Sequence, residues 1–163
     1  MTVGILSDTH GACVITQAVA EQMLQASVEA VFHCGDFGGT KILKILSAVF
    51  SPLKIPIFAV LGNVDGTPVA VPEGVELLGR FGTIDWHGKK IALLHGDDQK
   101  KLQQTVLSGE FDFVFSGHLH TVHDYTKDKT RCINPGSVVL GRGSPDSFAL
   151  LDLNSGALTI KPS

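Results

Sequence analysis

The chain has 163 residues, of which 44% are hydrophobic and 18% are charged, and its formal net charge is −3. These values fit one globular domain, residues 1–163, and they exclude disordered and fibrous classes. No run of Lys or Arg occurs, so the sequence predicts no surface for long DNA or RNA and leaves only a short nucleotide open. No apolar run is long enough to span a bilayer, and the N-terminus carries no basic leader. Three cysteines without a CxxC pair predict reduced thiols, so we expect a cytoplasmic protein with no membrane association.

The first half of the chain alternates strand patterns with helical patterns. Short apolar runs predict strands at residues 3–6, 30–33 and 57–61. The first intervening segment has one apolar helical face, made of Ile15, Ala18, Val19, Met23 and Ala26. The second has another such face, made of Ile42, Ile45, Leu46 and Val49, and Pro52 ends this helix.

The second half is richer in strands, which we predict at residues 75–78, 83–86, 90–94, 113–115 and 131–133. One helix interrupts them; it begins at the capping candidates Asp97 and Asp98 and ends near Gly109. Residues 148–153 and 157–160 predict a terminal hairpin. Alternating strand–helix units followed by more meandering strands indicate two mixed sheets packed together with helices outside.

Polar side chains follow five of these strand patterns at the point where each strand ends. They are Asp8, His10, Asp36, Asn63, His95, His118 and His120. Because ligands bind at the carboxyl ends of strands in open α/β sheets, we expect these side chains to be neighbours. Each alone has an ordinary structural explanation, such as a helix cap or a turn. Together they form a set of nitrogen and oxygen donors without a thiolate, which suits Mn, Fe, Zn, Ni or Co, and Asp36 can bridge two ions.

The same residues carry a resemblance to a known family. Five motifs match, in order, those of the calcineurin-like metallophosphoesterases: Asp8-Thr9-His10, Gly35-Asp36, Gly62-Asn63-Val64-Asp65, His95-Gly96 and Gly117-His118-Leu119-His120. Ile133-Asn134-Pro135-Gly136-Ser137 is similar to a further motif of the small phosphodiesterase branch. The resemblance covers the chain from Val3 to about Leu153 and implies an α/β fold, a four-layer α/β/β/α sandwich of two mixed sheets flanked by helices.

The resemblance also implies a dinuclear site. Asp8, His10 and His120 would hold one divalent ion, Asn63, His95 and His118 the other, and Asp36 would bridge them. Mn is the favoured ion, with Ni, Fe, Zn, Co and Mg as alternatives. The implied reaction is hydrolysis of a small phosphodiester by a metal-bridging water or hydroxide, with Asp36, Asn63 and His95 as the catalytic residues. The alternatives are a phosphomonoesterase or nucleotidase with the same site, and a metal-free protein-binding scaffold like the retromer subunit of this fold. Homo-oligomers are common among such proteins, but no sequence pattern identifies an interface.

Two positions depart from the family pattern. Val64 stands where many members have a His that contacts phosphate or protonates the leaving group, so the general acid is unassigned. Asp97 stands where a second His is frequent, and we interpret it as a helix cap first and a substrate-side group second.

Other polar and aromatic residues have structural explanations that compete with functional ones. We expect His33 to be a hydrogen-bonded core residue, with orientation of a ligand as the alternative. His123 is expected in an exposed loop unless it faces the cleft, and Trp86 and Tyr125 are expected to pack in the core rather than stack on a base.

Overall fold

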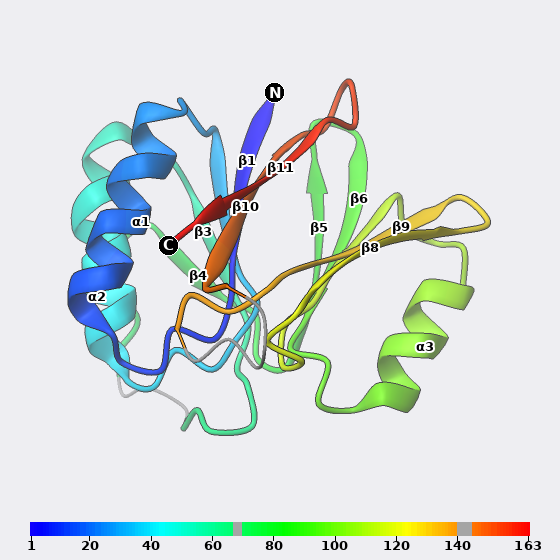
Figure 1. Cartoon of the computed structure of the whole chain (residues 1–163), viewed down its shortest axis with the longest axis horizontal. Coiled ribbons are helices and arrows are strands. Elements are labelled where there is room, and N and C mark those ends of the chain that lie inside the picture. Colours follow the sequence, from blue (N-terminus) through cyan, green and yellow to red (C-terminus); the bar gives the residue numbers. More distant parts are fainter. Residues whose placement is uncertain (67–69, 140–144) are drawn as a thin grey trace.

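The computed structural model describes residues 1–66, 70–139 and 145–163 (Figure 1). The helices are α1 (Cys13–Gln25), α2 (Thr40–Phe50), the 3-10 helix η1 (Ser51–Leu53) and α3 (Gln99–Leu107). The strands are β1 (Thr2–Leu6), β2 (Ala30–His33), β3 (Ile57–Ala59), β4 (Val75–Leu77), β5 (Phe81–Trp86), β6 (Lys89–Leu94), β7 (Phe113–Phe115), β8 (Val122–Lys127), β9 (Thr130–Pro135), β10 (Ser147–Asp152) and β11 (Leu158–Pro162). Within the described ranges, no helix is long and apolar enough to cross a membrane.

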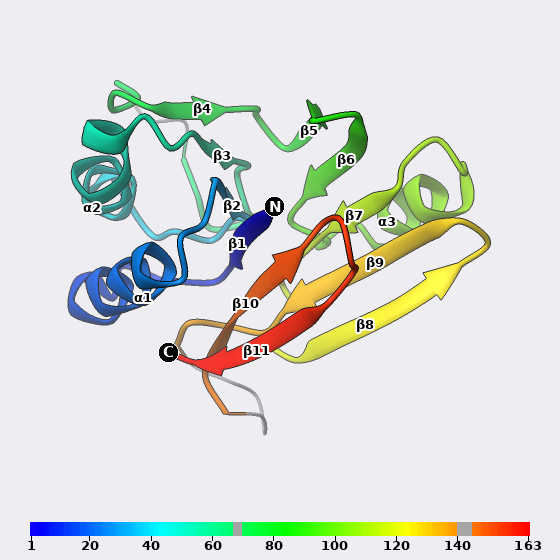
Figure 2. The ribbon, with the colours of Figure 1, turned by 90° about the horizontal axis from the view of Figure 1, so that it is seen from above.

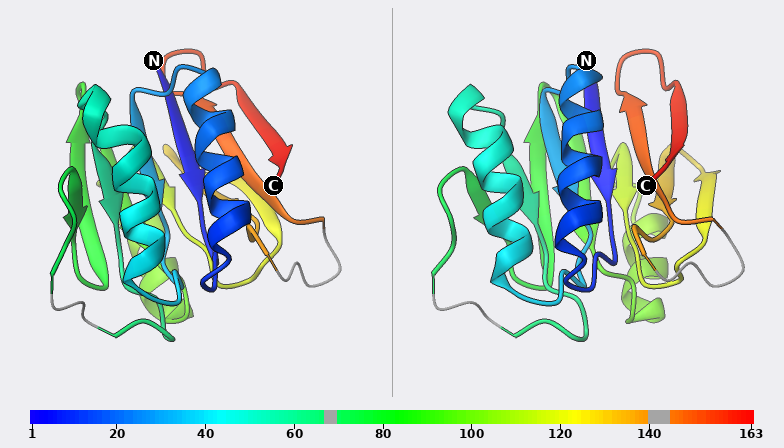
Figure 3. Two further views of the ribbon diagram at one scale, coloured as in Figure 1. Left: turned by 90° about the vertical axis from the view of Figure 1, so that its left-hand side faces the viewer. Right: turned by 60° about the vertical axis from the view of Figure 1, so that its left-hand side comes forward.

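The strands form two mixed sheets. The first has the order β11-β10-β1-β2-β3-β4, with β1 to β4 parallel and the β10–β11 hairpin antiparallel at one side. The second has the order β5-β6-β7-β9-β8, with β6, β7 and β9 parallel and an antiparallel strand at each edge. Helices α1 and α2 cover the outer face of the first sheet, and α3 covers that of the second (Figures 2 and 3). The predicted four-layer α/β/β/α sandwich is confirmed.

Three apolar layers hold the sandwich together. The central layer lies between the sheets, where the Phe32 ring is 5.3 Å from that of Phe58 and 5.1 Å from that of Phe115. Successive strand residues point to opposite faces, so Val31 packs beneath α1 and α2 while Phe32 enters the central layer. The third layer joins α3 to the second sheet. Burial on both faces explains the continuous apolar runs that predicted the central strands.

Two elements differ from the sequence-based expectation. Strand β8 was not predicted, because it is an exposed edge strand of mostly polar residues that shows no apolar alternation. The buried stripe of α1 consists of Thr16, Val19, Ala20 and Met23. The prediction for Val19 and Met23 is therefore confirmed, whereas Ile15 and Ala18 are exposed. Met23 lies directly over Gly4, where a Cβ would come within 2.6 Å of the Met23 sulfur, so the helix packs closely on β1 along this stripe.

Candidate metal centre

The loops that follow β1, β2, β3, β6 and β7 meet at one edge of the two sheets. In the first sheet the Asp8 amide donates to the Gly35 carbonyl at 3.0 Å, and the His10 amide donates to the Asp36 carbonyl at 3.0 Å. In the second sheet the Gly117 amide donates to the His95 carbonyl at 2.8 Å. These bonds hold neighbouring loops together, so side chains far apart in sequence converge.

Two groups of possible ligand atoms result. The atoms offered by Asp8, His10 and His120 lie within 4.8 Å of one another, and those of Asp8, Asp36 and His95 satisfy the same limit. Asp36 Oδ2 is 3.3 Å from His95 Nε2 and 3.9 Å from His10 Nε2, so it lies between the two groups. Asp8 belongs to both groups, which the sequence did not predict.

The two remaining predicted residues lie next to these groups. Asn63 Oδ1 is 3.1 Å from His95 Nε2. The His118 ring centroid is 5.1 Å from that of His95, and the His118 amide donates to Asp8 Oδ2 at 3.0 Å. Among the described residues, His118 belongs to neither group of closely spaced ligand atoms. The structure therefore brings all seven predicted residues to one place, with His118 at its margin.

The site has the polarity that a cation requires. Asp8 Oδ1 and His10 Nε2 are buried and have no hydrogen-bond partner in the described part of the chain; their neighbours are other ligand atoms. Burying such atoms without a partner is costly, so they fit a bound ion. The donors are carboxylate, amide and imidazole atoms, which is a set that divalent metals accept.

Asp36 and His95 form the most strongly coupled pair. Burial alone would raise the pKa of Asp36, but hydrogen bonds from His95 and from the Val64 amide outweigh it and lower this pKa. Burial would lower the pKa of His95, but the hydrogen bond to Asp36 and the charge of Asp8 outweigh it and raise this pKa. His95 Nδ1 lies 2.9 Å from the Cys34 carbonyl, to which it must donate, so Nε2 is the nitrogen that faces Asp36 and Asn63.

The backbone is unusual at the same residues. Five of the seven predicted ligands have a positive φ: Asp8 (55°), His10 (41°), Asp36 (55°), His118 (69°) and His120 (56°). Residues other than glycine rarely adopt this left-handed conformation, and such strain concentrates at functional sites. Gly35, at φ 99°, is required beside them because a Cβ there would come within 2.8 Å of the Gly62 nitrogen and 2.9 Å of His95 Nδ1.

Three residues that hold the loops were quoted in motifs but assigned no role. The Asp65 carboxylate accepts from the amides of Phe37, Gly38 and Gly62 at 3.2, 3.0 and 2.9 Å, and so joins the loops after β2 and β3. Asn134 Nδ2 donates to the Gly117 carbonyl at 2.7 Å, and Ser137 Oγ donates to the Asp8 carbonyl at 3.1 Å. Their presence in those motifs was the only signal available, because hydrogen bonds to distant backbone atoms leave no local pattern.

Val64 and Asp97, the two residues that depart from the family pattern, both lie in loops beside the candidate site. The Val64 side chain is 53% exposed, and its amide donates to Asp36 Oδ1 at 3.1 Å. The helix-cap prediction for Asp97 is wrong, because Asp98 is the N-cap of α3 and accepts from the Lys101 amide at 3.0 Å. Asp97 instead pairs with Arg80, whose guanidinium also donates to the Gly62 carbonyl at 3.0 Å. A cavity of about 180 Å³ lies here, lined in part by Arg80, His95 and Asp97.

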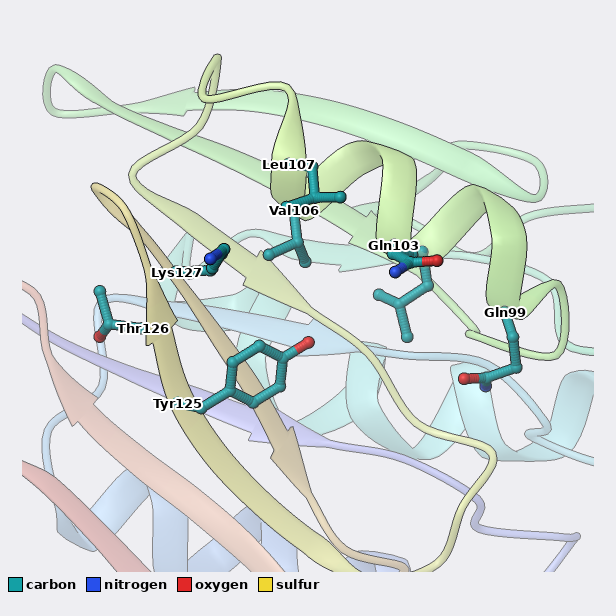
Figure 4. Close-up of a pocket in the computed structure, with 8 residues that line it drawn as sticks. Gln99, Gln103, Val106, Leu107, Tyr125, Thr126 and Lys127 are labelled. Carbon is teal, nitrogen blue, oxygen red and sulfur yellow. The ribbon is translucent and has the colours of Figure 1, made fainter.

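The remaining candidates are not among the seven predicted ligands. His33 is fully buried and hydrogen-bonded, and Trp86 packs against the Phe58 ring at 5.9 Å, as expected. His123 is exposed but lies in β8 rather than in a loop. The core prediction for Tyr125 is wrong: it is 47% exposed and extends beneath α3 into a cavity of about 430 Å³ (Figure 4). None of the seven ligands lines this larger cavity, so it is not the metal centre.

Comparison with known proteins agrees with this site. Residues 1–156 match the family model of the calcineurin-like phosphoesterase superfamily domain. The phosphodiesterase MJ0936 of Methanocaldococcus jannaschii is 31% identical to this chain over 142 residues, which are 83% of each protein. A solved structure of a novel archaeal phosphodiesterase has a TM-score of 0.88 and 26% identity, and the match covers 99% of both chains. Zinc-bound Vps29 of Entamoeba histolytica has a TM-score of 0.71 over 98% of this chain and 90% of Vps29, but at 22% identity it shows the shared fold alone.

The chain therefore belongs to the calcineurin-like phosphoesterase superfamily. Within that superfamily it is similar, over nearly its whole length, to a protein described as an archaeal phosphodiesterase. The predicted resemblance is confirmed, whereas the division of the candidate residues between two ions stays a prediction.

Proposed function

We propose that this protein is a metal-dependent phosphodiesterase that hydrolyses a small phosphodiester with two divalent ions. The observation that carries the proposal is the pair of ligand groups that share Asp8, with Asp36 between them, at the carboxyl edge of both sheets. The similarity to proteins named phosphodiesterases supports it.

The seven residues would divide between two ions. Asp8, His10 and His120 would hold one ion, Asn63, His95 and His118 would hold the other, and Asp36 would bridge them, with Asp8 shared by both groups of closely spaced atoms. Two divalent ions bound here supply positive charge at the phosphoryl oxygens and a water of lowered pKa. We name Mn²⁺ first because the donors are oxygen and nitrogen atoms without a thiolate, and Ni, Fe, Zn, Co and Mg are the alternatives.

Backbone groups of the protein orient the side chains of His95 and Asp36 in the site. The Cys34 carbonyl fixes the tautomer of His95 and directs Nε2 into the site, as partners behind a metal-binding His ordinarily do. The Val64 amide orients the Asp36 carboxylate at 3.1 Å, but its side chain can donate no proton. The leaving group must therefore depart unassisted, or take its proton from solvent or from a residue other than Val64, with His123 and Asp97 as the first candidates. Rates should fall steeply as the pKa of the leaving group rises, and Val64→His should flatten this dependence if the imidazole reaches the leaving oxygen.

The proposal also covers the cellular location, the domain organisation, the substrate and the assembly of the protein. The three cysteines are free thiols, which fits a reducing cytoplasm. One continuous apolar layer lies between the sheets, so we treat residues 1–163 as one catalytic domain. We include nucleotides among the small diesters. We also include a homo-oligomer among the assemblies that this protein can form.

The test is reconstitution followed by a substrate comparison. The protein is stripped with a chelator, loaded with each ion in turn, and assayed on bis(p-nitrophenyl) phosphate and p-nitrophenyl phosphate, with bound metal measured in every sample. We expect restored hydrolysis that favours the diester. Faster turnover of the monoester would assign a phosphomonoesterase, and a protein that binds no ion and hydrolyses neither ester would favour the metal-free scaffold alternative.

A further inference from the structure

A chain of hydrogen bonds runs through His33, which is fully buried at the end of β2. The Gly35 amide donates to His33 Nδ1 at 3.1 Å, so Nδ1 carries a lone pair rather than a proton. The proton of the neutral ring is therefore on Nε2, which donates to the Thr9 hydroxyl at 3.0 Å. The Thr9 hydroxyl in turn lies 3.4 Å from the Phe37 carbonyl and donates to it.

This chain joins two loops that carry predicted metal ligands. Thr9 stands between Asp8 and His10, whereas Gly35 and Phe37 flank Asp36. All three of these ligands have left-handed backbone conformations. Such conformations persist only where the surroundings over-determine them.

We propose that His33 is a positioning residue of the metal centre, which as a neutral imidazole locks the Asp8–His10 loop against the Asp36 loop before any ion binds. This inference rests on the proposed dinuclear site but not on the identity of the substrate. His33 touches no reacting group; it acts through Thr9 and Gly35.

A purely structural role explains these contacts less well. His33 faces the Phe37 ring edge-on at 5.9 Å, so the polar contacts of the imidazole are not required for this packing contact. A buried imidazole is costly unless both nitrogens are satisfied, and here both are satisfied by the two ligand-bearing loops.

The backbone already holds these loops near each other without His33. The Asp8, His10 and Gly11 amides donate to the carbonyls of Gly35, Asp36 and Phe37 at 3.0, 3.0 and 2.8 Å. Breaking the bond from His33 to Thr9 should therefore leave the fold in place and loosen the orientation of the ligands. Its effect should appear in ion affinity as well as in the stability of the metal-free protein, because the His33 Nε2–H is left buried without an acceptor.

The central variant is Thr9→Val, which keeps the shape of the side chain and removes its hydroxyl. Thr9→Ser restores a hydroxyl at the same place. Thr16→Val is the matched control, because Thr16 is also fully buried and its hydroxyl has no partner among the described residues. His33→Asn keeps an acceptor for the Gly35 amide but is too short to reach Thr9.

Two measurements are made on each protein after chelation: Mn²⁺ affinity by calorimetric titration and the melting temperature of the metal-free form. We expect Thr9→Val to weaken Mn²⁺ binding by about 10–100-fold, the range typical of residues that orient metal ligands. Its metal-free melting temperature should fall below that of Thr16→Val, because the buried His33 Nε2–H loses its acceptor whereas the Thr16 hydroxyl has none to lose. Thr9→Ser should recover most of the affinity and of the stability. His33→Asn combined with Thr9→Val should bind no more weakly than either single variant, because both remove the same bond.

The outcomes separate this inference from the proposed function. Mn²⁺ affinity unchanged within about threefold in Thr9→Val, or a loss equalled by Thr16→Val, would overturn the positioning role of His33 and leave the dinuclear site intact. If the variants show the expected Mn²⁺ affinities but the wild-type protein hydrolyses no diester, the role of His33 is supported and the proposed phosphodiesterase activity is refuted. A wild-type protein that binds no Mn²⁺ or other divalent ion would overturn both.

Discussion

The two sheets contribute different chemistry to the same edge of the molecule. Among the predicted ligands, the loops of the first sheet carry both carboxylates, the amide of Asn63 and one imidazole, whereas the loops of the second sheet carry three imidazoles and no carboxylate. Their supports differ too. His33 and Asp65 hold the first set, and Asn134 holds the second.

Neither sheet contains a complete ligand group. Asp8 and His10 of the first sheet need His120 of the second, and Asp8 and Asp36 need His95. The first sheet therefore supplies the negative charge and the second supplies neutral donors at a fixed spacing. An ion bound to either group would clamp the two sheets together at this edge.

The largest effect should come from removing charge on the first sheet. Asp36→Asn keeps the size of the side chain and an oxygen for the Val64 amide, but it cannot supply a bridging negative charge. We expect loss of at least one ion per chain and a fall in turnover of at least about 10²–10³-fold, the range for loss of one preorganised charge-stabilising group. Metal analysis and the diester assay measure both quantities.

The control for this variant is Asp85→Asn, which makes the same chemical change at an exposed position in β5. Full metal occupancy with near-normal turnover in Asp36→Asn would refute the bridging assignment. It would leave Asp8, the residue shared by both ligand groups, as the alternative bridge.

The clamp across the sheets predicts the next effect. Chelation should lower the melting temperature, because an ion at a hundred times its Kd stabilises the folded state by about 2.7 kcal/mol. For a domain of this size, about 2–4 °C per kcal/mol converts this figure to a shift of roughly 5–10 °C. Calorimetry with and without chelator, followed by Mn²⁺ addition, measures it. Identical curves, on protein shown to have contained metal, would contradict the clamp.

A support on the second sheet should have an effect of comparable size. Asn134→Ala leaves the Gly117 carbonyl and the Gly136 amide without their partner, and each such buried group costs about 1–3 kcal/mol. We expect a larger fall in the metal-free melting temperature than in Thr9→Val on the first sheet, where one buried group, the His33 Nε2–H, loses its partner. Asn154→Ala, in the exposed β10–β11 turn, is the matched control. Equal melting temperatures for the Asn134 and Asn154 variants would show that the hydrogen bonds of Asn134 do not stabilise the metal-free protein.

The candidate ligands could be grouped from the sequence because each lies within five residues of the end of a strand. A buried parallel strand is a continuous apolar run, so polar residues shortly after it fall at the carboxyl edge of the sheet. Asp8, Asp36 and His95 could therefore be placed together before any coordinates were available. The motif order then supplied the family.

The supports were not predictable for a physical reason. The hydrogen bond between Asn134 and Gly117 joins residues 17 positions apart, and that between His33 and Thr9 joins residues 24 positions apart. Hydrogen bonds between residues so far apart leave no periodic pattern in the sequence. Strand β8 was not predicted for a different reason, because an exposed edge strand needs no apolar face. The sharing of Asp8 between both groups depends on side-chain geometry that a motif does not encode.

The smallest effect should come from an exposed link between the two sheets, the ion pair of Arg80 and Asp97. Arg80 pairs with Asp97 after β6 and donates to the Gly62 carbonyl after β3, and so it connects a second-sheet loop to a first-sheet loop. Its side chain is 52% exposed, and that of Asp97 is 24% exposed. Solvent screens such pairs, which typically contribute about 0–1 kcal/mol.

Asp97→Asn should therefore lower the melting temperature of the metal-free protein by no more than about 4 °C, since a domain of this size shifts about 2–4 °C per kcal/mol. The difference from wild type should shrink as salt rises, because exposed charges are screened beyond about 10 Å at 0.1 M and about 3 Å at 1 M. Arg80→Lys keeps the charge but loses the fork that reaches both Asp97 and Gly62, so it should behave like Asp97→Asn. Mn²⁺ affinity should stay within about threefold of wild type in both variants, because neither residue offers a ligand atom to either group and a threefold change is well under 1 kcal/mol. A tenfold loss of Mn²⁺ affinity that persists at 1 M salt would mean that this exposed link orients Asn63 through Gly62, and the contrast between buried supports and exposed ones would fail.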